Sequence, residues 1–563
     1  MFYWFALQRI ERTHGIGVSR AGGLPTLRVA EHWQNVLEGG ARHRLEDVLP
    51  AFLQAQRWFG GKARRMRSVL ISKAIPLPME AEIALVTAVH VDYTDGAAEG
   101  YLLPLAYAEN ERASELQRQS PTSVVARVKT DTGSEGILYD ALVDEAFAAA
   151  LLETIANRRR LRSNGDQLVG SRMRSAYALQ ETVDSIRLMR DEQSNTSVVF
   201  SDKFILKVFR RLERGVNPDL EIGRFLTKKG GVSTPKVAGF LEHRSNEGTT
   251  TLGILHEYVP NQGSAWSYTL AEVERYYERA LALGWRKETS EPLPHPLDLT
   301  EQPPTDLARD LLGTYLETAR LLGTRTAELH RALASEPDNP DFAPEPFTTL
   351  YQRSLFQSMQ SHVTPVFNLL NERINQLPEP VRESARAVLA QKQAILKRMR
   401  RLLDSKLSGM RIRHHGDYHL GQVLYTGRDF VILDFEGEPA RPLSERKLKR
   451  SALRDVAGML RSFHYAAFAP LLRHRGGGAR PDLSAVEPWA RFWLAWASSS
   501  FLKAYLAEVG GASFLPKKRE EVRVLLDTFL LEKAVYELGY ELNNRPDWVR
   551  IPLQGIEDLL RGE

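Results

Sequence analysis

Two kinds of hydrophobic pattern divide the chain near residue 265. Before that point, short apolar or alternating runs bounded by turn residues predict β-strands. These runs cover 68–75, 81–93, 100–107, 185–190, 196–200, 203–209 and 252–258. After it, apolar residues at three- and four-residue intervals predict helices. The helical segments are 270–283, 307–333, 347–370, 381–405, 453–465, 489–506 and 517–543. A mixed sheet region followed by a mainly helical region indicates an α+β protein with two unequal lobes.

The first 176 residues lie outside this two-lobe pattern. A helix over 45–56 followed by meandering strands predicts a small α+β cap. A second helical pattern over 139–155 indicates a bridging segment. We therefore expect five parts. They are an extension or linker over 1–30, a cap over 31–130, an intermediate subdomain over 131–176, a sheet-rich lobe over 177–260 and a helical lobe over 261–563.

A β-hairpin inside the helical region carries most of the candidate chemistry. Apolar runs over 423–425 and 430–433 flank a Thr-Gly-Arg-Asp turn, which predicts the hairpin. Asp434 ends its second strand, and Asp417 and Gln422 lie in the polar loop before its first strand. Such a hairpin would bring these three side chains together. An ordinary hairpin with acids facing water is the alternative, but the coincidence of His-x-Asp, spacing and strand-end Asp argues against it.

These three oxygen-bearing side chains fit phosphoryl transfer from a nucleotide. That reaction needs a carboxylate that orients the attacking hydroxyl, and hard oxygen ligands for Mg²⁺. We therefore assign Asp417 as the catalytic base and Gln422 and Asp434 as the metal ligands. We expect His415 to pack beneath the loop.

Lys207 is the candidate phosphate-binding cation. It lies inside an apolar strand, and a lysine there is destabilising unless its ammonium has a partner. An edge-strand lysine that reaches water is the alternative. Because a helix with Glu221 follows, we expect a Lys207–Glu221 pair that grips the nucleotide phosphates.

Composition limits the class of protein. With 563 residues, 43% apolar and 26% charged, the chain is typical of a soluble globular protein of several units. Lys and Arg exceed Asp and Glu by five (75 against 70), too few to argue for a nucleic-acid partner. The absence of cysteine excludes disulfides and thiolate metal sites. Without a membrane-length apolar run or a signal-peptide pattern, we expect a cytoplasmic protein with no membrane partner.

The stretch Asp417–Glu438 resembles the catalytic and metal loops of aminoglycoside-phosphotransferase-like kinases and, more narrowly, of bacterial maltokinases. Gln422, where the wider family has Asn, is similar to the maltokinase pattern. The segment Arg57–Lys62, RWFGGK, lacks the residues of a Walker loop but resembles part of the maltokinase cap. The resemblance implies a bilobal protein-kinase-like fold with an N-terminal cap, and ATP and Mg²⁺ as cofactors. It also implies that Asp455 holds the backbone of the catalytic loop.

The resemblance also implies further nucleotide contacts. The loop over the phosphates would be Glu192–Ser197, which contains no glycine, so hydroxyls and amides would cap the phosphate oxygens. The hinge that contacts adenine would lie at Glu257–Pro260. The expected nucleotide-binding residues besides Lys207 and Glu221 are Ser194, Asn195, Thr196, Ser197, Glu257 and Val259.

A candidate acceptor site lies near the C-terminus. Lys533, Tyr536 and Tyr540 recur at three- and four-residue spacing, so one helix face could present all three. On the residues alone, a helix that docks on the lobe is an equally good interpretation. The segment 532–548 resembles the stretch that lines the maltose site in maltokinases, which implies acceptor contacts for these residues and adds Trp548 and Glu436.

The implied activity is that of an ATP:maltose 1-phosphotransferase, which supplies maltose 1-phosphate for glycogen or α-glucan synthesis from trehalose. A kinase of the same fold acting on glucosamine, another sugar or an aminoglycoside is the alternative. A nucleotide-binding scaffold is disfavoured because Lys207, Asp417 and Asp434 are all present. The apolar segment Met1–Gln8 resembles the last strand of a trehalose synthase, which suggests a fusion or a partner of that kind. A strand of the cap's own sheet is the alternative.

Overall fold

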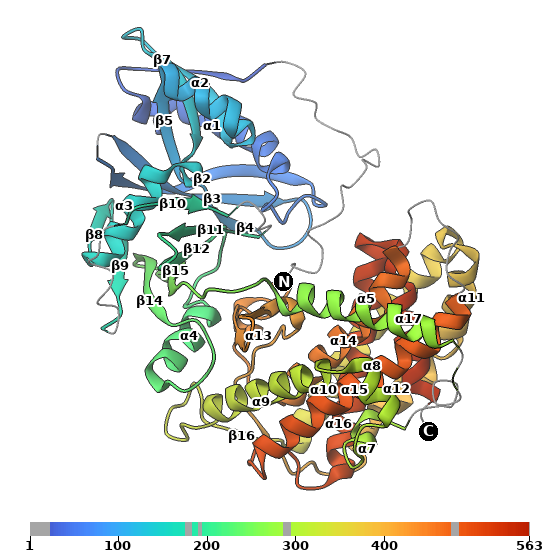
Figure 1. Ribbon diagram of the computed structural model, residues 1–563. Helices are drawn as coiled ribbons and strands as arrows, with labels where there is room; N and C mark the ends of the chain where they lie inside the picture. Colours follow the sequence, from blue (N-terminus) through green and yellow to red (C-terminus); the bar gives the residue numbers. More distant parts are fainter. Residues whose placement is uncertain are drawn as a thin grey trace.

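The computed structural model describes residues 23–80, 82–174, 183–189, 194–284, 286, 294–473 and 483–561. The expectations for Met1–Gln8, Glu192 and Gln193 fall outside these residues. The described chain forms a sheet-containing cap, a second sheet and a large helical lobe, stacked in that order in Figure 1. The predicted α+β, bilobal fold with an additional N-terminal cap is confirmed.

The cap is built on an eight-stranded sheet of order β1-β6-β7-β5-β3-β4-β13, with β2 paired to β3. Helix α1 (Gly39–Ala55) packs on one face, and α2 (Asn110–Gln119) follows β5. The strands are β1 (Thr26–Val29), β2 (Met66–Pro78), β3 (Ile83–Tyr93), β4 (Glu99–Leu102), β5 (Leu105–Glu109), β6 (Val124–Thr130), β7 (Glu135–Asp140) and β13 (Arg211–Leu212). The sheet therefore extends past residue 130, the expected end of the cap, and includes a strand from the next lobe.

The second sheet has the order β10-β11-β12-β15-β14-β9-β8. Its strands are β8 (Arg160–Ser163), β9 (Asp166–Arg172), β10 (Ile186–Leu188), β11 (Asn195–Phe200), β12 (Phe204–Phe209), β14 (Val237–Ser245) and β15 (Gly248–Glu257). Helix α3 (Glu145–Ala156) precedes β8, and α4 (Pro218–Lys229) follows β13. One face of this sheet shares a hydrophobic core with the cap, in which Val86 and Leu102 of the cap lie in the same cluster as Val198 and Leu206.

The third layer is helical and contains the predicted hairpin, β18 (Val423–Tyr425) and β19 (Phe430–Ile432). A second small sheet pairs β16 (Glu345–Pro346) with β17 (Met410–Arg411). The helices are α5 (Ala265–Leu283), α7 (Pro296–Leu299), α8 (Asp306–Leu312), α9 (Tyr315–Leu333), α10 (Thr349–Arg373), α11 (Glu379–Ala390), α12 (Lys392–Arg400), α13 (Leu443–Arg446), α14 (Leu453–Arg473), α15 (Leu483–Val509), α16 (Arg519–Asn544) and α17 (Arg550–Arg561). Within the described residues, no helix combines the length and apolar character that crossing a membrane requires.

Several predicted elements have different limits in the structure, and three of these differences have a clear local reason. The run 100–107 is two strands because Pro104, which lacks an N–H, separates β4 from β5. The helix expected from residue 139 begins at Glu145, after Asp144 accepts a hydrogen bond from the Ala146 amide at 2.9 Å. The helix expected over 307–333 is interrupted at Gly313, whose φ of +54° ends α8.

Candidate active site

Asp455, in the first turn of α14, binds the backbone of the candidate catalytic loop, residues 413–422. Its carboxylate accepts hydrogen bonds from the backbone amides of His415 at 2.7 Å and Gly416 at 3.0 Å. His330 Nε2 lies 3.0 Å from the same carboxylate. The expectation that Asp455 fixes the loop backbone is therefore confirmed. Three partners on one buried carboxylate restrict the loop to a single arrangement.

His415 packs under the loop, as expected. Its ring lies between those of Tyr418 and Phe435, with centroids 5.2 and 5.1 Å away, and its Nε2 is 3.0 Å from the Leu433 carbonyl oxygen. Gly416 next to it has a φ of +88°, and a Cβ there would lie 3.3 Å from the Gly437 Cα. The catalytic loop and the loop after β19 thus pack closely together.

Asp417 is buried, and its two carboxylate oxygens differ. Oδ1 lies 3.5 Å from the Lys533 ammonium. Oδ2 has no hydrogen-bond partner among the described residues and is 4.0 Å from His419 Nε2. A buried carboxylate oxygen without a partner is costly unless a ligand completes it. This oxygen is free to accept a proton from a bound hydroxyl.

The hairpin brings the two candidate metal ligands together. The Gln422 amide nitrogen donates to Asp434 Oδ2 at 2.7 Å, and Gln422 Oε1 has no partner in the described part of the chain. Asp434 has a φ of +68°, an unusual backbone conformation for a residue with a side chain. Such strain is typical of functional sites. An amide oxygen and a carboxylate are ligands of the kind that a hard cation such as Mg²⁺ prefers.

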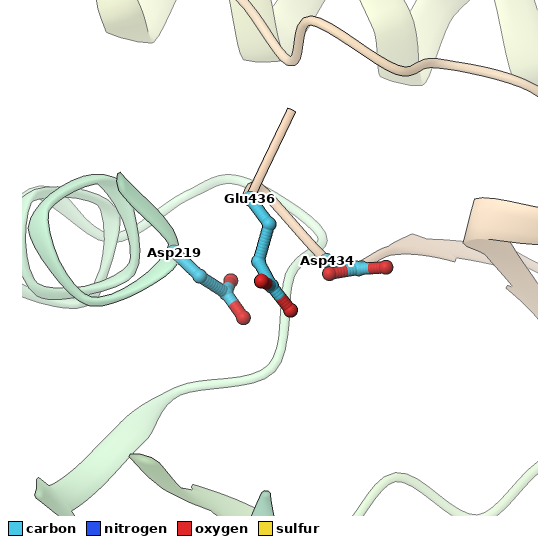
Figure 2. Close-up of side chains that lie close together, drawn as sticks. All are labelled: Asp219, Asp434 and Glu436. Atoms are coloured by element: carbon cyan, nitrogen blue, oxygen red, sulfur yellow. The ribbon is translucent and has the colours of Figure 1, made fainter. Parts of the chain in front are cut away.

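Lys207 lies among three carboxylates. Its Nζ is 2.6 Å from Asp434, 2.6 Å from Glu436 and 3.1 Å from Asp219. The three acids offer ligand atoms within 4.8 Å of one another, and Figure 2 shows Asp219 and Glu436 pointing into the same space beside Asp434. Burial alone would raise the pKa of Asp434, but the Lys207 charge holds it well below its usual range. Burial and the neighbouring acids raise the pKa of Glu436.

The expected Lys207–Glu221 pair is wrong. Glu221 instead lies 2.8 Å from Arg413 and 3.5 Å from Lys447 of the helical lobe. Two residues correspond to about 200° of rotation on a helix, so Glu221 faces away from Asp219 on α4. Asp219 takes the expected role, and it also accepts a hydrogen bond from the Phe435 amide at 3.0 Å.

A cleft of about 440 Å³ lies between the second sheet and the hairpin. Of the expected nucleotide-binding residues, those that line it are Ser194, Asn195, Ser197, Lys207, Glu257 and Val259. Thr196 does not, because alternate residues of β11 face opposite sides of the sheet. Its hydroxyl accepts from Arg210 Nε at 2.8 Å on the opposite face. The prediction for Thr196 is therefore wrong as regards direct contact.

A second, smaller pocket is lined by Asp417 and by residues of α14 and α16. Lys533 and Tyr536 of α16 line it, as the acceptor hypothesis requires, and the Lys533 ammonium is 4.8 Å from the Tyr536 ring centre. Glu438 also lines it, 3.2 Å from Lys533, although its role was not predicted from the sequence. Burial alone would raise the pKa of Glu438, but Lys533 and Arg441 lower it to about 2. The sequence feature that could have indicated Glu438 is its position at the end of the stretch DFEGE, residues 434–438.

The other three acceptor candidates lie elsewhere. Glu436 belongs to the Lys207 cluster, where Asn195 also donates to it at 2.9 Å. Trp548 is buried, and its ring stacks on Tyr465 with centroids 6.2 Å apart. Tyr540 is partly buried, with Arg545 over its ring at 5.9 Å. Neither Glu436 nor Trp548 lines the pocket beside Asp417, because Glu436 contacts Lys207 and Trp548 packs in the helical core. Their roles as acceptor contacts stay predictions.

The chain is similar to known proteins both in its cap and over about two thirds of its whole length. Residues 52–144 match the family described as the maltokinase N-terminal cap domain. Two curated relatives are glucosamine kinases. The one from Streptacidiphilus jiangxiensis is 24% identical over 375 residues, which is 66% of this chain and 72% of the relative. The one from Mycolicibacterium smegmatis is 24% identical over 389 residues, 68% of this chain and 81% of the relative.

Two solved structures have the same fold. A glucosamine kinase in complex with glucosamine, ADP and inorganic phosphate is 20% identical, with a TM-score of 0.57 over 91% of this chain and 96% of that chain. A second glucosamine kinase structure, in crystal form B, is 21% identical, with a TM-score of 0.59 over 90% and 97%. The chain therefore has the kinase-like fold with an N-terminal cap. Within it, residues 52–144 correspond to the maltokinase type of cap domain.

Proposed function

We propose that this protein is an ATP-dependent sugar kinase that phosphorylates maltose at its anomeric hydroxyl and produces maltose 1-phosphate. Asp417 orients that hydroxyl and accepts its proton, and Lys207 contacts the nucleotide phosphates. Gln422 and Asp434 hold Mg²⁺, which would neutralise the phosphate charge when bound. The large cleft takes the nucleotide, with Glu257 and Val259 at the adenine end, and the pocket at Lys533 and Tyr536 takes the sugar.

The pairing of charges in the acceptor pocket is the main reason for proposing a neutral sugar rather than an amino sugar. Glu438 and Asp417 share the Lys533 ammonium, at 3.2 and 3.5 Å. Glu532 is paired with both terminal nitrogens of Arg454, at 2.9 and 3.0 Å. No carboxylate of this pocket, among the described residues, is left without a charged or hydrogen-bonding partner. A neutral sugar with hydroxyls suits such a wall, since an ammonium would need an unpaired carboxylate. The match of residues 52–144 to the maltokinase cap supports the same acceptor.

Glucosamine is the second candidate, because the curated relatives are named glucosamine kinases. Two carboxylates of the acceptor pocket support this candidate. Glu438 and Glu532 both line the acceptor pocket and could contact an amino group if Lys533 or Arg454 moved away. The two candidates therefore differ in whether these ion pairs persist when the sugar binds.

A maltose kinase depends on an enzyme that supplies maltose. The resemblance of Met1–Gln8 to the end of a trehalose synthase makes that enzyme our proposed partner, as a fusion or a separate protein. We propose that both act in the cytoplasm, where ATP is available. Removal of residues 1–22 leaves β1 intact and tests this assignment. If the segment is a fusion remnant, activity and thermal midpoint should not change.

A coupled ADP-release assay with maltose, glucose, glucosamine and an aminoglycoside tests the proposed acceptor. We expect the highest kcat/KM with maltose. Higher kcat/KM with glucosamine would overturn the maltose assignment. The variant Lys533→Met sharpens the test because it frees Glu438 from one cation. It should weaken maltose turnover and move the preference toward glucosamine.

A further inference from the structure

A buried arginine joins the cap to the back of the nucleotide site. Arg210 follows β12 directly and is only 3% exposed. Its Nε donates to the Thr196 hydroxyl at 2.8 Å, and its Nη2 lies 2.7 Å from Asp140. Its guanidinium also lies over the Trp58 ring, 4.6 Å from the ring centre. Two of these partners, Asp140 and Trp58, belong to the cap, whereas Thr196 belongs to the second sheet.

The backbone on either side of Arg210 strengthens this connection. The Arg210 carbonyl accepts from the Leu102 amide at 2.7 Å, and Arg211 pairs with Tyr101 of β4. The chain that leaves Lys207 therefore enters the cap sheet at Arg211, four residues later. Trp58 belongs to the RWFGGK segment, which has no part in the proposed catalytic chemistry.

The Thr196–Arg210 contact lies on the face of the sheet that is turned away from the nucleotide cleft. Thr196 lies between Asn195 and Ser197 on β11, and those two neighbours line the cleft. Ser197 pairs in register with Lys207 across the β11–β12 ladder. A shift of Thr196 would therefore move the side chains that face the phosphates. Because strand positions alternate, Arg210 can act on this site without entering it.

Arg210 satisfies its charge mainly through the cap. A guanidinium buried this deeply needs an anionic partner, and Asp140 of the cap supplies it. The charge-assisted hydrogen bond to Thr196 then fixes β11 relative to the cap. We propose that Arg210 is a positioning residue through which the cap holds the phosphate-facing strand in its binding arrangement, so that cap contacts set the affinity for nucleotide. This inference rests on the proposed nucleotide cleft and gives the cap a role in the reaction.

Matched variants in the full-length protein separate this role from simple support of the fold. Thr196→Val removes the hydroxyl that Arg210 contacts but keeps the shape of the side chain, whereas Thr196→Ser keeps the hydroxyl. Asp140→Asn weakens the ion pair from the cap side, at a residue that does not line the cleft. Lys73→Met is the control, because it removes a different ion pair between cap and second sheet, Lys73–Asp166 at 3.2 Å.

Binding of Mg–ATP, measured by calorimetry without sugar and well below the thermal midpoint, is the decisive readout. Thr196→Val and Asp140→Asn should each raise the Kd by about three- to tenfold, the effect of weakening one charge-assisted hydrogen bond. Thr196→Ser and Lys73→Met should stay within about twofold of wild type. The KM for sugar should not change in any of them.

The outcomes distinguish the two proposals. If the wild type binds Mg–ATP and both Thr196→Val and Asp140→Asn bind it equally well, Arg210 only supports the fold and the inference is overturned. An equal loss in Lys73→Met would also overturn it, because the effect would then be a general loosening of the cap. If the wild type does not bind Mg–ATP, the proposed function falls and the inference falls with it. If Asp140→Asn gives little folded protein, the Kd values of Thr196→Val and Thr196→Ser for Mg–ATP decide between the two roles of Arg210.

Discussion

The ammonium of Lys207 lies 2.6 Å from the carboxylate of Asp434, across the cleft that separates the second sheet from the helical lobe. Glu436 and Asp219 complete its surroundings. Three acids around one lysine leave an excess of negative charge, which a metal ion would neutralise. Nucleotide phosphates would compete with Asp434 and Glu436 for Lys207, whereas Asp219 on α4 can stay paired with it.

Asp219→Asn should therefore impair nucleotide binding more than Glu221→Gln does. The amide keeps an acceptor for the Phe435 N–H but loses the charge beside Lys207, and we expect the KM for ATP to rise about tenfold. Glu221→Gln should leave this KM within about twofold, because Glu221 contacts Arg413 and Lys447 instead. The KM for ATP at saturating sugar measures both. A larger effect from Glu221→Gln would refute this assignment.

Asp417→Asn should abolish turnover while nucleotide still binds. The amide cannot accept the proton of the sugar hydroxyl at the position of Oδ2. We expect kcat to fall by ~10²–10⁴-fold, the usual contribution of a general base. The Kd for Mg–ATP should stay within about twofold, since Asp417 lies outside the nucleotide cleft. A variant that keeps more than about a tenth of the wild-type rate would place the base elsewhere.

The two proposed metal ligands should differ in strength. Asp434→Ala removes a full charge, and Gln422→Ala removes only an amide oxygen. We expect both variants to need more Mg²⁺ for half-maximal rate, with the larger increase for Asp434→Ala. Titration of Mg²⁺ against rate at fixed ATP measures this. An unchanged Mg²⁺ requirement in Asp434→Ala would contradict the metal site.

The sequence predicted the parts of this site that depend on local spacing. The turn between two apolar runs predicts the hairpin, and the hairpin alone brings Gln422 within 2.7 Å of Asp434. Lys207 was recognisable because a charge inside an apolar strand needs a partner. The sequence did not identify that partner. Asp219 and Glu221 both lie in the first turn of α4, and only the packing of the helix decides which one faces Lys207.

The long-range contacts could not be predicted for a similar reason. Glu438 meets Lys533 across 95 residues, and Arg210 meets Leu102 across 108. Both contacts depend on how separate layers dock, which strand and helix periodicity do not specify. Trp548, an expected acceptor contact from its place in the sequence, is instead buried in the helical core and does not line the pocket beside Asp417.

Tyr536→Ala should weaken acceptor binding more than Tyr540→Ala. Both residues lie on α16, but Tyr536 lines the pocket beside Asp417, and Tyr540 lies under Arg545. We expect Tyr536→Ala to raise the KM for the sugar about tenfold without changing the KM for ATP, the pattern of lost substrate binding. Tyr540→Ala is the matched control. Equal increases in both KM values for Tyr536→Ala would indicate a helix that only supports the lobe.

Glu541 should make the stability of the helical lobe depend on pH. Burial raises its pKa from 4.5 to about 7, although Arg545 and the Tyr465 hydroxyl favour the charged form and Glu537 opposes it. A carboxyl group with a raised folded-state pKa binds protons more tightly when folded, so stability falls as the pH rises from about 4.5 to 7. At ~1.4 kcal/mol per pKa unit, the loss is at most about 3.5 kcal/mol. Glu541→Gln lacks this titration. Its thermal midpoint, relative to that of the wild type, should therefore rise between pH 5 and pH 8. Midpoints that change in parallel over this range would show that Glu541 is already ionised at pH 5.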